Sequence, residues 1–238
     1  MKNKLNISLI TAAVLVAAGL IWVGCGIKSG LTTFAQRDRV ASVRGLCERE
    51  VPANLVTWPI VTQDMGNDLP ELYRSTHQIN SRILKFLNDN GINQEEISVA
   101  PLDVTDNLTS SYDPERVQQR YKVTSVIVVK SNQVDKVRKL IDRQTELISE
   151  GIAILAGSYQ YPITYDYTDL NAIKPDMIAE ATKKAREAAD KFAQDSESEL
   201  GGIKSAYQGQ FSINDRDQYT PYIKTVRVVT TLEYYLKD

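Results

Sequence analysis

The pattern of apolar residues along the chain begins with one long uninterrupted run. Residues 7–27 contain no charged residue, and only Ser8 and Thr11 carry a hydroxyl group. At about 1.5 Å per helical residue, the run forms a helix of roughly 30 Å, the thickness of the hydrocarbon core of a bilayer. No comparable run follows it. The pattern predicts a short cytoplasmic tail (1–6), a membrane-spanning anchor (7–27), a linker (28–38) and one large folded body (39–238).

Three interpretations of this N-terminal run remain open. A cleaved signal peptide has an apolar stretch of only about 7–15 residues before its cleavage site, which is shorter than this run. A lipoprotein signal would use Cys25, after Gly24, as the modified residue. An uncleaved anchor places Trp22 near a membrane interface, where aromatic side chains are enriched. The length of the run favours the uncleaved anchor.

The orientation of the anchor depends on the basic residues beside it. Lys2 and Lys4 precede the apolar run, whereas Lys28, Arg37 and Arg39 follow it, so the positive-inside comparison is nearly balanced. A very short basic tail before a long apolar run usually stays in the cytoplasm. We therefore expect a single-pass protein whose body lies outside the cytoplasmic membrane.

Beyond the linker, segments of alternating polarity are interleaved with segments of helical periodicity. Apolar residues recur every three or four positions over 69–86, which gives a helix with one apolar face. The closing segment 223–236 instead alternates between apolar and polar residues, as half-buried strands do. The patterns predict a two-lobed α+β body of approximate order ββαββ–αβαββ, with helices packed on one face of largely antiparallel sheets. The expected strands are 40–50, 53–62, 97–104, 119–130, 152–167, 203–213 and 223–236, and the expected helices are 69–86, 134–148 and 175–194.

The longest helix expected in the body is rich in alanine, which allows a helix to lie close to a sheet. Pro175 suits its first turn, and Gly201 and Gly202 are expected to form a turn before the next strand. An unpaired charge on the buried face would be costly, so Ala188→Asp is expected to destabilise the body. The face expected to be buried consists of Ile178, Ala181, Ala185, Ala188, Ala189 and Phe192.

Four tyrosines alternate along the strand expected at 152–167. In a regular strand Tyr159, Tyr161, Tyr165 and Tyr167 share one face, since successive side chains point to opposite faces. One interpretation makes this row a platform for a sugar ring, another small ligand or a partner. The other makes it a sheet face packed on a helix or on a second subunit, because tyrosine favours strands in any case.

Composition narrows the chemistry of the body. The net charge of −2 and the lack of a basic stripe argue against binding to nucleic acid. Its single cysteine, Cys47, is either a buried small apolar residue or a thiol that senses oxidants. A single histidine, His77, argues against zinc sites built on several histidines and against a Ser–His–Asp triad. No glycine-rich phosphate loop is present, so we expect neither a metal nor a cofactor.

Acidic residues near the ends of predicted strands are the only candidates for a catalytic site in this sequence. Asp103, Asp106, Asp166 and Asp169 could in principle form a catalytic pair of carboxylates, which requires a defined separation between the two groups. The chain has 30 acidic residues, however, so scattered pairs are expected without a catalytic role. We therefore expect a protein that is not an enzyme.

Several segments spread over nearly the whole body form a recognisable set: 43–45, 50–53, 121–151, 171–175, 180–181, 185–189, 201–203 and 226–228. Together they resemble the bacterial SIMPL-domain family, whose members are similar to periplasmic immunogenic proteins and have a domain of unknown function. The resemblance implies an exported or membrane-anchored envelope protein whose α/β body can form ring- or channel-like oligomers. It also implies a link, in some relatives, to resistance against oxidative stress, and it brings no catalytic residues.

Anchor, body and resemblance together predict a non-enzymatic protein of the cell envelope. It is expected in the bacterial cytoplasmic (inner) membrane, with its body in the periplasm or outside the cell and a second copy of itself as partner. A contribution to envelope or oxidative stress tolerance is part of this expectation. The alternative is a module that binds an envelope glycan or small ligand through the tyrosines of 159–167.

Overall fold

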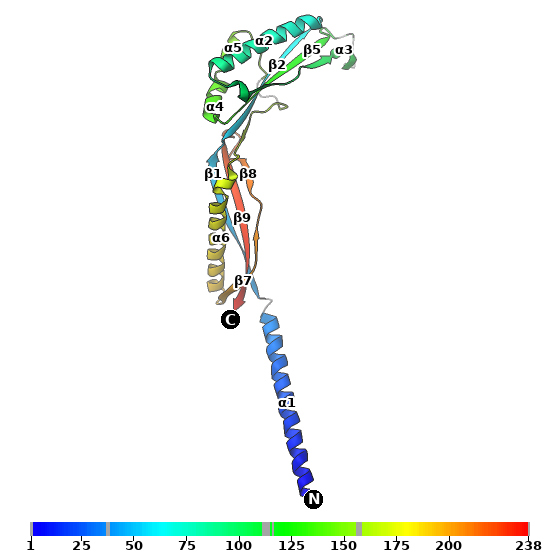
Figure 1. Cartoon of the computed structure of the whole chain (residues 1–238), viewed down its shortest axis with the longest axis vertical. Helices are drawn as coiled ribbons and strands as arrows, with labels where there is room; N and C mark the ends of the chain where they lie inside the picture. The colour runs from blue at the N-terminus through cyan, green and yellow to red at the C-terminus, as the bar shows by residue number, and fades with distance from the viewer. Residues whose placement is uncertain (1, 37–38, 111–114, 116, 156–158, 238) are drawn as a thin grey trace. The chain divides into compact units, whose positions relative to one another are not determined.

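The structure is a computed structural model that describes residues 2–36, 39–110, 115, 117–155 and 159–237 (Figure 1). The chain divides into two compact units, and each is described by itself. Unit 1 comprises Met1–Glu48, Ile173–Ser212 and Arg227–Asp238, and unit 2 comprises Arg49–Ala172 and Ile213–Val226. Wherever the register between two described strands is defined, the strands run antiparallel. The predicted two-lobed α+β body with largely antiparallel sheets is therefore confirmed.

The N-terminal helix α1 (Lys2–Gln36) is longer than the predicted anchor. Within it, residues Ile10–Leu31 have a mean hydropathy of 2.3 and none of this stretch is buried inside the protein, so the helix is long and apolar enough to cross a membrane. A signal sequence near an N-terminus has the same properties. The helix also continues through most of the expected linker, because residues 28–36 contain no proline to end it.

Unit 2 is built around two long neighbouring strands. Strand β2 (Leu55–Gly66) pairs with β5 (Tyr121–Ser131) from Val56 opposite Ser131 to Gly66 opposite Tyr121. The short strands β3 (Ile97–Val99) and β4 (Asp103–Asp106) both pair with β5, and β6 (Thr164–Asp166) pairs with β2. Two short helical segments, η1 (Gln94–Glu96) and α3 (Asn107–Ser110), precede β3 and follow β4.

Helices α2 (Leu69–Asp89), α4 (Val134–Asp142) and α5 (Thr145–Ser149) complete unit 2. Helix α2 begins as expected after Asp68, whose carboxylate accepts a hydrogen bond from the backbone N–H of Glu71. The helices and the sheet enclose one apolar core around Trp58, with Ile83 and Leu87 from α2 and Ile127 and Val129 from β5. Burial of these side chains supplies the main stabilisation of the unit.

Unit 1 contains a sheet of strand order β1–β9–β7 and the helix α6. Its strands are β1 (Val40–Pro52), β7 (Glu199–Gln208) and β9 (Ile223–Lys237). The short β8 (Ser212–Asp215) also pairs with β9, but its residues 213–215 belong to unit 2. Helix α6 (Leu170–Asp195) packs on this sheet through Ala185 and Ala189, which meet Leu232 and Tyr234 of β9. At Gly45 of β1, a Cβ atom would lie closer than 3.0 Å to backbone atoms of Ala181 and Ala185. A glycine is therefore required at this contact between helix and sheet.

The structure corrects two expectations about α6. The helix begins at Leu170, so Pro175 lies inside it and not in its first turn. Its buried face is a single row spaced four residues apart, whereas Ala188 is exposed and Phe192 is half exposed. A helix that packs on a sheet contacts it along a narrow stripe. The prediction of a wider buried face, which included Ala188 and Phe192, is therefore wrong. The buried row consists of Met177, Ala181, Ala185, Ala189 and Ala193.

Three expected elements also differ. Gly201 and Gly202 lie within β7, at irregularities in its register with β9, and do not form a separate turn. The expected strand 97–104 is broken into β3 and β4. The expected strand 152–167 is reduced to β6, with one isolated bridge between Ile154 and Thr62 of β2.

Candidate functional site

Strand β7 of unit 1 is an edge strand that is exposed on both faces from Gly202 to Gln208, whereas Leu200 near its start packs against the core beside α6. Within the described chain β7 pairs only with β9, so its outer backbone edge carries unpaired N–H and C=O groups. Ile203 is 52% exposed and Tyr207 is 67% exposed. An exposed edge that bears large apolar side chains is a site where another strand or surface can add.

The two ends of β7 differ in how well they could pair with another strand. Its register against β9 is irregular between Leu200 and Ser205, and Gly201 closely approaches the backbone carbonyl of Tyr235. Such bulges twist an edge and discourage pairing. From Ser205 to Gln208 the ladder is regular, and Ser205 Oγ donates to Glu233 at 2.9 Å. The regular segment 205–208 is therefore the part of the edge best formed for contact.

The four tyrosines of 159–167 do not share one strand. Ile154 forms a bridge to Thr62 of β2, whereas Thr164 of β6 pairs with Thr57, and these two pairings do not belong to one continuous register. Tyr159 lies in a turn and is fully exposed, whereas Tyr161 and Tyr167 are half-buried. Residues 156–158 of the expected strand lie outside the described residues. Ligand binding by the tyrosines stays a prediction.

Tyr165 is the one tyrosine of this set that packs into the core of unit 2. Its ring meets that of Tyr222 edge to face, with 6.2 Å between ring centroids, and burial raises the pKa of its hydroxyl. The guanidinium of Arg138 lies 3.4 Å from the centroid of the Tyr222 ring. Sequence reasoning missed this cluster because its three members are far apart along the chain and no local pattern connects them.

The thiol of Cys47 is completely buried in β1, on the face of the sheet that α6 covers. This placement agrees with the interpretation as a buried apolar residue, because an oxidant sensor needs an accessible thiolate. Cys25 lies exposed on α1. Among the described residues, no three histidine, cysteine or acidic side chains lie close enough to hold a metal ion.

The four candidate carboxylates are divided between two edges of the sheet in unit 2. Asp103 and Asp106 lie on β4, beside β5, whereas Asp166 lies on β6, beside β2. Asp106 forms an ion pair with Arg120 at 2.9 Å, and the hydrogen bond from Arg120 lowers the pKa of its carboxyl group. Asp169 accepts a hydrogen bond from Tyr167 through its backbone carbonyl. The structure therefore does not bring Asp103 and Asp106 together with Asp166 and Asp169 in one site.

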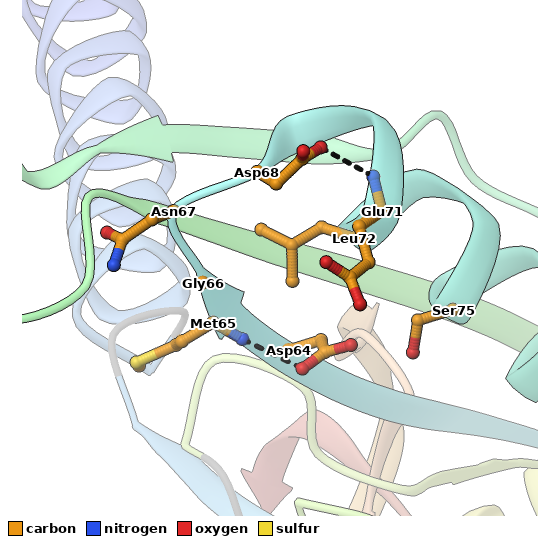
Figure 2. A pocket seen from close by; sticks show the side chains of 8 residues that line it. All are labelled: Asp64, Met65, Gly66, Asn67, Asp68, Glu71, Leu72 and Ser75. Atoms are coloured by element: carbon orange, nitrogen blue, oxygen red, sulfur yellow. Dashed lines mark hydrogen bonds between the residues drawn. The ribbon is translucent and has the colours of Figure 1, made fainter.

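A small acidic pocket of about 270 Å³ lies where β2 leads into α2 (Figure 2). Three of its lining residues carry carboxylates: Asp64, Asp68 and Glu71. Figure 2 shows two of them bound to backbone N–H groups, Asp68 to that of Glu71 and Asp64 to that of Met65. These bonds hold the turn and the start of α2 in place, so the carboxylates of Asp64 and Asp68 have a structural role in this pocket.

Comparison with known protein families gives a match over most of the chain. The family model described as SIMPL, a protein of unknown function (DUF541), matches residues 41–230. The match begins at the second residue of β1 and ends within β9, so it includes strands and helices of both units. The search of curated proteins found no match.

Proposed function

The chain belongs to the SIMPL family, and we propose that it is a non-enzymatic, membrane-anchored protein of the bacterial cell envelope that self-assembles through its α+β body. Helix α1 supports the anchoring, since its apolar stretch of 22 residues matches the roughly 20 residues that cross a bilayer. In this proposal the anchor lies in the cytoplasmic membrane and the body lies in the periplasm or outside the cell.

The observation that carries the proposed self-assembly is the exposed edge strand β7. Pairing along 205–208 with a second copy would satisfy backbone groups that otherwise bond to water, and it would cover Tyr207. Each cross-strand side-chain pair contributes about 0.2–1 kcal/mol, so a few residues alone give a weak contact. Two anchored copies share one membrane, which raises their effective concentration and favours such contacts.

The test of assembly is the mass of the full chain in detergent micelles, measured by size-exclusion chromatography with light scattering. We expect an oligomer for the wild type and a shift toward the monomer for Tyr207→Lys. Tyr219→Lys is the matched control, because Tyr219 is also an exposed tyrosine, 82% exposed, but lies outside β7. A wild-type monomer at high micromolar concentration contradicts self-assembly.

Membrane topology is tested by digestion with a protease in intact and in opened cells. The proposal expects the body to be cut only when the protease reaches the periplasmic or outer side, and it expects α1 to remain on the mature protein. Recovery of the mature protein from the cytosol contradicts the proposed location.

A contribution to oxidative stress tolerance is the least direct part of the proposal. Deletion of the gene is expected to raise sensitivity to peroxide, and the wild-type gene is expected to restore resistance. Because Cys47 is buried, Cys47→Ser is expected to restore resistance equally well. Equal peroxide sensitivity with and without the gene removes this part of the proposal.

A further inference from the structure

The sheet of unit 1 has a second edge strand, β1, on the side of β9 opposite to β7. Among the described strands, β1 pairs with β9 alone. The carbonyl of Arg39 accepts a hydrogen bond from the N–H of Leu236, and the N–H of Ala53 donates one to the carbonyl of Tyr222. The same number of residues separates these two contacts on both strands, so β1 follows β9 in one register without a bulge. Its outer edge therefore carries a regular row of backbone groups that the sheet leaves unpaired.

The residues of β1 whose backbone groups point outward can be identified. Successive residues of a strand direct their groups to opposite edges, and the carbonyl of Arg39 points to β9. The groups of Arg44, Leu46 and Glu48 therefore point outward. Gly45 lies against α6, so the side chains of its two neighbours lie on the other face of the sheet, where Leu46 is 39% exposed.

The outward groups of β7 belong to residues on the opposite face. The N–H of Gly209 donates to the carbonyl of Val229 at 2.8 Å and continues the regular ladder at the end of β7. The groups of Ala206 therefore point outward. Ala206 pairs with Leu232, which packs against α6, so its side chain lies on the face that α6 covers. The two edges thus differ: outward groups come from the α6 face on β7 and from the other face on β1.

Both edge strands run away from the end of the sheet that the chain tethers to the anchor. Helix α1 ends at Gln36, and Arg39 is already bonded to Leu236, so the Cα atoms of Gln36 and Arg39 are at most about 11 Å apart. Strand β7 begins at the same end, where Glu199 pairs with Lys237. Antiparallel pairing between two copies would point these ends in opposite directions. Parallel pairing keeps them on the same side, which suits copies anchored in one membrane.

We propose that β7 of one copy pairs in parallel with β1 of the next copy, with Tyr207 opposite Leu46. This proposal names the partner strand for the proposed self-assembly and rests on it. In a parallel pair, a residue that directs its groups to the partner strand lies opposite one that directs them away, and both side chains share a face. Ala206 opposite Gly45 meets this condition and places α6 on the same face in both copies.

The register and the choice of partner strand follow from exposure and symmetry. Tyr207, which is 67% exposed, and Leu46 lie on the same face and would cover each other. Pairing of β7 with a second β7 would leave both β1 edges unpaired. Since β1 and β7 are different surfaces, their contact is heterologous and continues from copy to copy beyond a dimer.

Proline substitutions test which strand is the partner. Proline at a residue whose N–H points outward removes a bond to the partner and leaves the pairing with β9 intact. Ala206→Pro and Leu46→Pro are both expected to shift the full chain in detergent micelles toward the monomer, measured by light scattering. Ser42→Pro is the matched control, because its N–H also points outward but lies outside the paired segment. An oligomer that survives Leu46→Pro and is lost in Ala206→Pro overturns the proposal.

Disulfide formation tests the register in chains that keep all backbone groups. Ser205→Cys and Arg44→Cys, each in a Cys25→Ser, Cys47→Ala background, would lie opposite each other on strands about 4.8 Å apart, within the reach of a disulfide. After oxidation, their mixture is expected to give at least about fivefold more linked dimer than either variant alone. A mixture of Ser205→Cys with Glu48→Cys, which lies about 13 Å further along β1, is the matched control and should stay at the level of the single variants.

The pattern of linked species separates this proposal from self-assembly itself. A chain with both Ser205→Cys and Arg44→Cys should form linked trimers and larger species, because each copy then contributes to two contacts. Linked dimers of Ser205→Cys alone indicate that β7 pairs with itself and overturn the proposal. An oligomer without linkage between the two positions also overturns it and leaves self-assembly standing, whereas a wild-type monomer removes both.

Discussion

The contact between α6 and β1 at Gly45 provides the sharpest test of the fold. The perturbation is the smallest available, a single methyl group in Gly45→Ala. In an open strand this change is favourable by about 0.5–1 kcal/mol, because glycine loses more conformational freedom on folding than alanine. Here the added Cβ would lie within 3.0 Å of backbone atoms of Ala181 and Ala185, so the sign is expected to reverse.

The magnitude follows from which atoms have to move. A flexible side chain could rotate away, but the clashing atoms belong to the backbone of α6, so a whole helical turn must shift from the sheet. Overpacking of a close-packed contact costs about 1–3 kcal/mol and occasionally more. Because the added Cβ would approach backbone atoms so closely, the upper end of this range applies. After subtraction of the favourable entropy we expect destabilisation of about 2 kcal/mol, which lowers Tm by about 4–8 °C in a domain of 150–250 residues.

The assay is thermal unfolding of the full chain in detergent micelles, followed by circular dichroism. Gly202→Ala is the matched control, because Gly202 also lies in a strand of unit 1 and nothing would lie within 4 Å of its added Cβ. This control is expected to keep or slightly raise Tm. A melting temperature of Gly45→Ala equal to that of Gly202→Ala refutes the close approach of α6 to β1.

Three further predictions concern burial and charge. Ala185→Asp is expected to destabilise the body by several kcal/mol, since it places an unpaired charge on the buried row, whereas Ala188→Asp on the exposed side should leave urea unfolding nearly unchanged. Hydrogen bonds, first of all from the Thr220 hydroxyl, lower the pKa of Asp217 from 3.8 to about 2, so its stabilising contribution is present above about pH 4 and is lost toward pH 2. Asp217→Asn should therefore show a shallower loss of stability over this interval in urea titrations, and an unchanged slope counts against the interaction. In a Cys25→Ser background, Cys47 should react with maleimide only after unfolding, and rapid labelling of the folded protein would contradict its burial.

Elements with a strong periodic pattern were predictable from the sequence. Helix α2 has its apolar residues at helical spacing over 69–86, and the structure confirms this helix and its apolar face. Strand β9 alternates between buried and more exposed residues over nearly its whole length, as expected from 223–236. In both elements the local pattern and the tertiary environment specify the same structure, and such agreement makes a prediction reliable.

The segment 152–167 shows why other elements could not be predicted. Its alternating tyrosines fit a strand, and both ends do pair with β2, at Ile154 and at β6. The registers of these two pairings do not match, however, and the described residues 159–163 between them form no strand. Register is set by contacts with β2 that lie far away in sequence, and a local pattern carries no information about it.

The exposed edge of the sheet in unit 1 results from the width of a helix compared with the spacing of the strands. Neighbouring strands lie about 4.8 Å apart, and a helix with its side chains is about 10 Å wide, so one helix covers about two strands. In the described residues of unit 1, α6 is the one helix that packs on the sheet, and it buries alternate residues of β1 and β9. Beyond Leu200, which packs beside α6, the edge strand β7 is left uncovered, with Ile203 and Tyr207 exposed. A single helix on the sheet of β1, β9 and β7 thus leaves an apolar surface that a second copy can cover, and this is the physical basis of the proposed assembly.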